Sequence, residues 1–254
     1  MTLTAERVRA AWPSTAPIEV RATTASTNDD AKALARAGAP HGALCLAEAQ
    51  TAGRGRSGSA WFSPPGDNLY ASIVLVPRAA RVAPAATFTL AAGVVVARVV
   101  DARLDGAPAR IKWPNDVHVR GRKIAGILVE GTSRGASPGP LVVGVGINVR
   151  TRAFPEALAE IATSLAIEGG GGLDLSGLAA DLARGVVDAF ELHEREGLAP
   201  FLSALREKDA LFGATVRVDG ITGRAEGIEP DGSLAVRGED GGRHLVIAGH
   251  VERC

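Results

Sequence analysis

Two arginines stand among three glycines in residues 53–58, a composition that suits an anion-binding loop. Glycine lets the backbone approach a ligand closely and adopt positive φ angles. The planar guanidinium groups of Arg54 and Arg56 suit carboxylates and phosphates. Trp61 follows closely, and its ring could fill the core or cover a flat group such as adenine. Short arginine–glycine runs also occur in flexible nucleic-acid tails, so the loop alone leaves its ligand open.

Two lysines flank a predicted β-hairpin that turns at Gly121. The chain has only four lysines against an arginine-rich background, and Lys112 and Lys123 are two of them. Asp116 lies between them and could hold one lysine charged and oriented. Two solvated lysines at a strand edge are the alternative interpretation. Asn115 and Asp116 after a proline are also ordinary turn chemistry.

Together these cations suit a reaction between two anions. A carboxylate and a nucleotide phosphate repel each other, and cationic donors lower that repulsion while the α-phosphate is attacked. Such a reaction needs positioning and charge stabilisation rather than a nucleophilic side chain. The five histidines lack metal-ligand spacing, so we expect no protein-bound metal. The sequence also contains no Walker loop and no nucleophile elbow.

Several polar residues at the ends of elements have both a functional and a structural interpretation. Gln50 ends a predicted strand, and its amide suits an amide or ureido ligand, although surface glutamines are common. Asn148 is either a turn residue or a polar contact at a strand end. Ser26 and Thr27 suit a helix N-terminus whatever else they contact.

Alternating strand and helix patterns supply the framework for these residues. Thr27 and Asp30 form a predicted capping pair, and Ser176 is the predicted N-cap of a long amphipathic helix. Glycines inside a strand mark close backbone approach, which we expect at Gly144 and Gly146. Strands are predicted over 42–50, 69–77 and 141–149, a β-hairpin over 110–119 and 123–130, and helices over about 26–37, 87–104, 155–165, 176–196 and 199–211.

The bulk composition narrows the class of protein. The 254 residues are 46% hydrophobic with a formal net charge of zero, so no global field draws the chain to DNA or an anionic membrane. No apolar run is long enough to span a bilayer, and the start lacks a signal peptide. Two cysteines make no disulfide framework, and Cys45 is predicted to be buried. A cytoplasmic location is therefore expected.

The ordered motifs resemble those of the biotin–protein ligases, also called biotin–[acetyl-CoA-carboxylase] ligases. Order and spacing hold from about residue 20 to the C-terminus. The matching stretches are Ser26-Thr27-Asn28, Gln50 with Gly53-Arg54-Gly55-Arg56 through Trp61-Phe62-Ser63-Pro64, Asn68-Leu69-Tyr70, Lys112-Trp113-Pro114-Asn115-Asp116, Lys123-Ile124-Ala125-Gly126-Ile127-Leu128-Val129-Glu130, Gly144-Val145-Gly146-Ile147-Asn148 and Ala162-Thr163-Ser164-Leu165.

The resemblance implies a two-step reaction. Biotin and ATP with Mg²⁺ give biotinyl-5′-AMP, and a lysine of the carrier domain of a biotin-dependent carboxylase then takes the biotinyl group. Biotin is a substrate, and no permanently bound cofactor is implied. By matched position, Lys123, Arg56, Lys112 and Asp116 are expected in catalysis, Ser26, Thr27, Gln50, Gly53, Arg54 and Gly126 at biotin, and Arg54, Arg56, Trp61, Lys123 and Asn148 at the nucleotide.

The implied fold class is α+β. A mixed sheet with flanking helices, similar to class II aminoacyl-tRNA synthetases, is expected in a catalytic biotin/ATP-binding domain over 1–209. A small SH3-like barrel is expected over 210–254, where short β segments replace the helices. Some family members carry an N-terminal DNA-binding module. Only about twenty residues precede the ligase region here, so we expect no specific DNA binding. The sequence leaves the oligomeric state undecided, with a homodimer as one possibility.

One departure and two alternatives remain. Many relatives have basic residues where this loop has Ser57, Ser59 and Ala60, which predicts a weaker hold on the adenylate. A lipoate–protein ligase or octanoyltransferase of related fold is the nearer alternative, although its apolar substrate lacks a ureido ring. A module that binds biotin or nucleotide without turnover is the alternative from another class.

Overall fold

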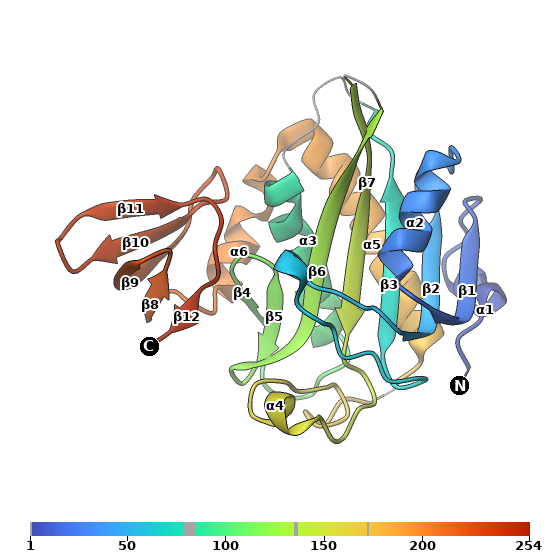
Figure 1. The fold of residues 1–254 in the computed structure, drawn as a ribbon, viewed down its shortest axis with the longest axis horizontal. Helices are drawn as coiled ribbons and strands as arrows, with labels where there is room; N and C mark the ends of the chain where they lie inside the picture. The colour runs from blue at the N-terminus through green and yellow to red at the C-terminus, as the bar shows by residue number, and fades with distance from the viewer. Residues whose placement is uncertain (1, 79–84, 135–136, 172) are drawn as a thin grey trace.

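The computed structural model describes residues 2–78, 85–134, 137–171 and 173–254. A seven-stranded mixed sheet with helices on both faces forms its larger part, and a five-stranded antiparallel sheet lies beside it (Figure 1). This arrangement confirms the predicted fold class. None of the described helices is long and apolar enough to cross a bilayer.

The large sheet is mixed because its first two strands pair in parallel and its other neighbours pair antiparallel. Strand β3 (Leu69–Leu75), which lies between β2 and β7, is buried along its whole length, as expected of a strand covered on both faces. The strands are β1 (Ile18–Thr24), β2 (Leu44–Gln50), β3 (Leu69–Leu75), β4 (Arg110–Lys112), β5 (Asp116–Val119), β6 (Arg122–Arg134) and β7 (Ser137–Ile147), in the order β1-β2-β3-β7-β6-β5-β4.

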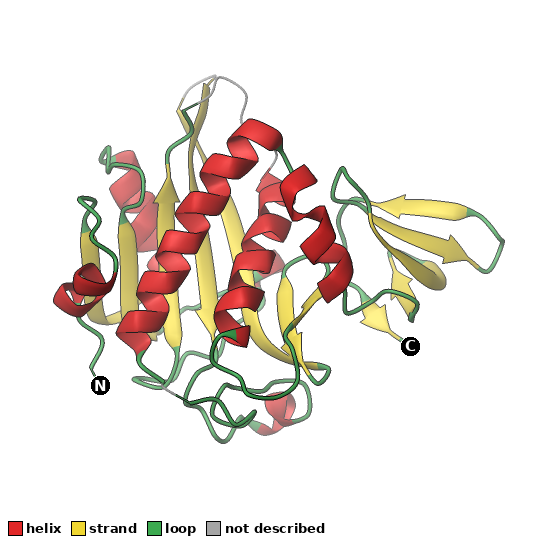
Figure 2. Ribbon diagram, turned by 180° about the vertical axis from the view of Figure 1, so that it is seen from behind, coloured by secondary structure: helices red, strands yellow, loops and turns green. Residues whose placement is uncertain are grey.

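Helices α3 (Ala85–Asp101) and α5 (Leu175–Glu196) pack together over one face of this sheet (Figure 2). Their apolar residues pack with those of the strands in the main core, as the apolar pattern of residues 87–104 predicted. Helix α2 (Thr27–Arg36) covers the other face over a smaller cluster that includes Cys45. The remaining helices are α1 (Ala5–Ala11), α4 (Glu156–Ala159) and α6 (Leu202–Lys208).

The small sheet follows α6 and is docked on the large one. The indole nitrogen of Trp113 donates to the carbonyl of Gly232 at 3.0 Å, which ties the turn between β9 and β10 to the β4–β5 connection. A domain boundary near residue 210 stays a prediction. The strands are β8 (Thr215–Val218), β9 (Ile221–Ile228), β10 (Leu234–Gly238), β11 (Arg243–Val246) and β12 (Glu252–Arg253), in the order β11-β10-β9-β8-β12.

The predicted helix caps were wrong by one or two residues. Ser26 is the N-cap of α2, and Thr27 is its first residue, because the threonine side chain turns inward to other polar groups. Asp174 caps α5, and its carboxylate accepts from the backbone amides of Ser176 and Gly177. At α2 the long-range contacts of Thr27 excluded it as the N-cap. At α5 the carboxylate of Asp174 is a stronger acceptor than the hydroxyl of Ser176.

Other element limits also differ from the prediction. The helix predicted over 155–165 ends at Ala159, because the following residues run beside β6, where the Lys123 amide donates to the Ile161 carbonyl at 2.8 Å. The helix predicted over 199–211 begins as a 3-10 turn and ends at Lys208. Helix α1 and strand β1 were not predicted.

Burial of His193 on α5 predicts a pH-dependent stability. The residue is 1% exposed and packs against Phe88, and burial lowers its pKa from 6.5 to about 4. Because the folded state favours the neutral ring, this stabilisation is complete above about pH 6.5 and is lost as the pH falls towards 4. The loss should reach about 3 kcal/mol in the free energy of unfolding.

Urea unfolding of the parent and the His193→Phe variant at several pH values between 7 and 4 would measure this effect. Carboxylates contribute to both proteins alike, so the difference between the two isolates the histidine. Equal slopes against pH would show that His193 does not titrate on unfolding.

Candidate active site

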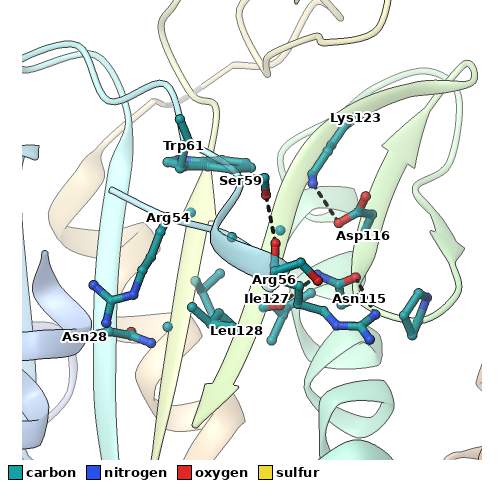
Figure 3. A pocket seen from close by; sticks show the side chains of 18 of the residues that line it. Asn28, Arg54, Arg56, Ser59, Trp61, Asn115, Asp116, Lys123, Ile127 and Leu128 are labelled. Atoms are coloured by element: carbon teal, nitrogen blue, oxygen red, sulfur yellow. Dashed lines mark hydrogen bonds and ion pairs between the residues drawn. The ribbon is translucent and has the colours of Figure 1, made fainter. Parts of the chain in front are cut away.

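A cavity of about 590 Å³ lies on the sheet face that also carries α2 (Figure 3). Its wall combines the start of α2, the glycine-rich loop, the β4–β5 connection, the first half of β6, the end of β7, and the connection between β11 and β12. The lining residues are 26–28, 50, 54–57, 59–61, 70, 112–116, 123, 126–128, 144–146 and 248–251.

The glycine-rich loop is folded back on itself by its own backbone. The Gly55 amide donates to the Ser59 carbonyl at 2.7 Å, and the Trp61 amide donates to the Gly53 carbonyl at 2.9 Å. Ser57 takes a left-handed conformation with φ 54° at the tip. This tight turn directs the two arginine side chains to different sides of the cavity.

A lysine–aspartate pair stands at one side of the cavity. Lys123 on β6 places its Nζ 2.7 Å from Oδ1 of Asp116 on β5, and the same Nζ lies 5.3 Å from the centre of the Trp61 ring. Arg56 approaches from the loop, with Nη1 3.5 Å from Oδ1 of Asn115. Figure 3 shows the Arg56–Asn115 contact and the Lys123–Asp116 pair on the same side of the cavity.

The position of Lys112 corrects part of the predicted hairpin. The turn at Gly121 is confirmed, with φ 80°, but it joins β5 to β6. Lys112 belongs to the separate short strand β4 and pairs in register with Asp116, because the chain already reverses between β4 and β5. The two lysines are therefore on strands that flank β5 rather than on adjacent strands, and both line the cavity.

Glycines in β6 and β7 make room for Trp61. A Cβ at Gly146 would lie 2.5 Å from Cε2 of the indole, and one at Gly126 would lie 3.1 Å from Cζ3. The close backbone approach predicted at Gly146 is thus confirmed. The indole N–H is buried and has no partner among the described residues, so it is a candidate donor to a ligand.

Two of the residues expected at biotin, Thr27 and Gln50, contact each other directly, whereas Arg54 pairs with Asp29 and Gly126 lies beside Trp61. The Gln50 Oε1 accepts from the Thr27 amide at 2.9 Å and lies 3.2 Å from the Thr27 hydroxyl. Its Nε2 donates to the Ser63 hydroxyl at 3.2 Å. Ser26 lines the same part of the cavity. These amide and hydroxyl groups can exchange hydrogen bonds with a polar, uncharged ring.

Two predicted site residues lie outside the cavity lining. A Cβ at Gly53 would be 2.8 Å from Nε2 of Gln50, so this glycine lets the loop pass close behind that side chain. Asn148 is buried and donates from Nδ2 to the Thr163 carbonyl at 3.0 Å. The structure therefore gives Asn148 the task of holding the segment beside β6.

Several residues at the site were not found from the sequence. Asp29 and Glu130 contact the predicted residue Arg54, and Asn28 donates to Glu130. Residues 248–251, which connect β11 to β12, also line the cavity. Asn28 and Glu130 stand in stretches that carry the family resemblance, but their roles depend on partners far away in the chain, and no pattern marks Asp29 or residues 248–251. The described residues hold no cluster of three or more His, Cys, Asp or Glu side chains placed to bind a metal.

Comparisons with known proteins agree with the motifs and the fold. A family model described as the biotin/lipoate A/B protein ligase family matches residues 20–148. A biotin–[acetyl-CoA-carboxylase] ligase of Paracoccus denitrificans is 34% identical and aligns over 91% of this chain and 98% of its own length. The same-named protein of Mycobacterium tuberculosis is 35% identical over 91% of this chain and 86% of its own.

Longer relatives and a solved structure are also similar. The Escherichia coli bifunctional ligase/repressor BirA is 39% identical over 79% of this chain, which spans only 63% of that relative's length. A biotin protein ligase from Aquifex aeolicus, solved in complex with biotin and ATP, is 26% identical, covers 94% of this chain and 99% of its own, and superposes with a TM-score of 0.81. The chain therefore belongs to the biotin/lipoate A/B protein ligase family, and its relatives place it among the biotin protein ligases.

Proposed function

We propose that this protein activates biotin with ATP to biotinyl-5′-AMP and transfers the biotinyl group to a lysine of a carrier domain of a biotin-dependent carboxylase. One observation carries the proposal: a single cavity is lined by the amide and hydroxyl groups around Gln50 and by the cations Lys123, Lys112 and Arg56. The first set suits a ureido ring, and the second suits a carboxylate beside a phosphate.

In the first step, a biotin carboxylate oxygen would attack the α-phosphorus of ATP. The bond between the α-phosphorus and the bridging oxygen would break, and pyrophosphate would leave with Mg²⁺ that entered with ATP as part of the substrate. Lys123 would neutralise charge on both reactants as they meet. Asp116 would hold that ammonium group in place through the 2.7 Å ion pair.

In the second step, the amine of the carrier lysine would attack the acyl carbon of the adenylate. The amide bond forms, the bond to the phosphate oxygen breaks, AMP leaves, and the nitrogen releases its proton to solvent. Trp61 would cover the adenine, while the loop with Arg56 would keep the reactive intermediate in the cavity until the carrier arrives.

Mass spectrometry of the purified protein incubated with biotin, ATP and Mg²⁺ tests the proposal. We expect biotinyl-AMP in the first incubation and a carrier heavier by one biotinyl group after a carrier domain is added. Adenylate formation with lipoate but not with biotin would favour the related lipoate ligases. Tight biotin binding without any adenylate would favour a non-catalytic module.

Replacing Arg56 with alanine should release the intermediate. Loss of one charge-assisted hydrogen bond to a phosphate costs about 1.5 kcal/mol, so biotinyl-AMP should escape about tenfold faster. Free adenylate acylates exposed lysines without selection, so unrelated proteins in the mixture should become labelled. Arg36→Ala removes an exposed charge from α2 and is the matched control. Labelling that stays confined to the carrier would contradict this role.

A further inference from the structure

We infer that Asp29 and Glu130 are positioning residues that hold Arg54, and through Arg54 the glycine-rich loop, against the cavity. The inference rests on the proposed adenylate-forming function. It also assigns Arg54 a different task from direct contact with biotin or nucleotide. Asp29 lies in the first turn of α2, and Glu130 lies on β6, so the loop is fastened to two elements that also line the site.

The contacts of Arg54 carry this assignment. Its Nη1 and Nη2 donate to the two carboxylate oxygens of Asp29 at 2.7 and 2.6 Å, a bidentate geometry with high directional specificity. Its Nη2 is also 3.5 Å from Oε2 of Glu130. The guanidinium group is thus already satisfied by two carboxylates. Figure 3 shows it beside Asn28, on the opposite side of the cavity from the Lys123–Asp116 pair.

Glu130 is itself held firmly in its charged form. Lys32 donates to its Oε1, and Asn28 donates from Nδ2 to its Oε2 at 2.7 Å. Burial by itself would raise the pKa of Glu130, but these hydrogen bonds and the nearby charges of Lys32 and Arg54 outweigh it and keep the pKa below its ordinary value. A fixed, charged carboxylate gives Arg54 a defined place to dock.

A buried chain of hydrogen bonds joins this group to the residues around Gln50. The Ser72 hydroxyl is fully buried and lies 2.6 Å from Oδ1 of Asn28 and 2.8 Å from the hydroxyl of Thr27. Because Asn28 Oδ1 can only accept, the Ser72 hydroxyl donates its single hydrogen to that oxygen. The Thr27 hydroxyl then donates either to Ser72 or to Gln50. The same network that anchors Glu130 therefore also orients the side chains expected at biotin.

Loosening this anchor should reduce the fraction of molecules whose loop is in place. Apparent affinity falls in proportion to that fraction, so the KM for biotin and ATP should rise, and the adenylate should escape faster. The rate at saturating substrate should change less, because Lys123 and Asp116 are untouched. A residue that only stabilised the fold would not produce this separation of KM from kcat.

Asp29→Asn, Glu130→Gln and a double-mutant cycle with Arg54→Ala test the inference. Asp30→Asn is the matched control, because Asp30 is an acid in the same turn of α2 whose ion-pair partner is Arg21. We expect biotinyl-AMP to escape about fivefold faster from Asp29→Asn than from the parent protein, and at the parent rate from the control. Adding Asp29→Asn to Arg54→Ala should give no further increase in the escape rate. Effects that multiply in the double variant would overturn the inference.

Hydrogen exchange of the free variants provides a readout that needs no catalysis. The amides of residues 53–61 should exchange about fivefold faster in Asp29→Asn and Glu130→Gln than in the parent protein. In Asp30→Asn their exchange rates should equal those of the parent. Unchanged exchange in all variants would refute the positioning role even if the enzyme is active. If the two variants exchange faster but the parent protein forms no adenylate, the anchor is upheld and the proposed function is rejected instead.

Discussion

Replacing Lys123 with alanine is expected to slow adenylate formation about a hundredfold, equivalent to about 3 kcal/mol of lost transition-state stabilisation. The ammonium group lies 2.7 Å from Asp116 and faces the cavity beside the Trp61 ring. Without it, the biotin carboxylate and the α-phosphate would meet with less of their repulsion screened, while the Asp116 carboxylate would stay behind as an unpaired negative charge. Pyrophosphate release in single-turnover experiments measures the loss.

Lys208→Ala is the control for this variant. Lys208 is also partly buried and also paired, with Nζ 2.5 Å from Oδ2 of Asp101, but it lies outside the cavity lining. Its loss should lower stability without slowing adenylation. A Lys123→Ala protein with near-parent rates would remove Lys123 from the reaction, and a second variant, Asp116→Asn, would show whether the pair acts as a unit.

The second large effect is expected from Gly144→Ala, which should destabilise the protein by about 3 kcal/mol. A Cβ at this position would lie 2.0 Å from Oδ1 of Asn28. Asn28 is buried and held by Ser72 and Glu130, so it cannot give way without breaking those hydrogen bonds. Urea unfolding measures the loss, and biotin binding should weaken as well because Thr27 shares the same network.

Gly131→Ala in the neighbouring strand β6 is the matched control. A Cβ there would meet only Cδ2 of Leu141 at 3.7 Å, an ordinary contact, so its unfolding free energy should change little. If Gly144→Ala were as stable as this control, the contact between α2 and β7 would be looser than the structure shows, and the buried network could not position Thr27.

Local signals were sufficient for much of the framework. The turn at Gly121, the strand that ends at Gln50 and the apolar helix α3 were predicted because each depends on residues close together in the chain. Helix α1 and strand β1 were missed, since they are held by pairing with β2 and by packing on α5 rather than by a strong pattern of their own.

The small sheet has features that local sequence predicted and others that depend on distant contacts. Its short β segments and turns were evident from the sequence, yet nothing local indicated that residues 248–251 would line the cavity. That placement depends on contacts between the two sheets, such as the hydrogen bond between Trp113 and Gly232, which are 119 positions apart.

The sequence by itself determined the chemical types at the site and the order of the elements that carry them. It indicated a glycine-rich loop with two arginines, scarce lysines around a hairpin, and glycines where backbone and side chain pass closely. Only the tertiary structure decided which partner each charge takes: Lys123 with Asp116, and Arg54 with Asp29 and Glu130. The physical reason is that a charge can be satisfied by any opposite charge within a few ångströms, and only the folded chain sets those distances.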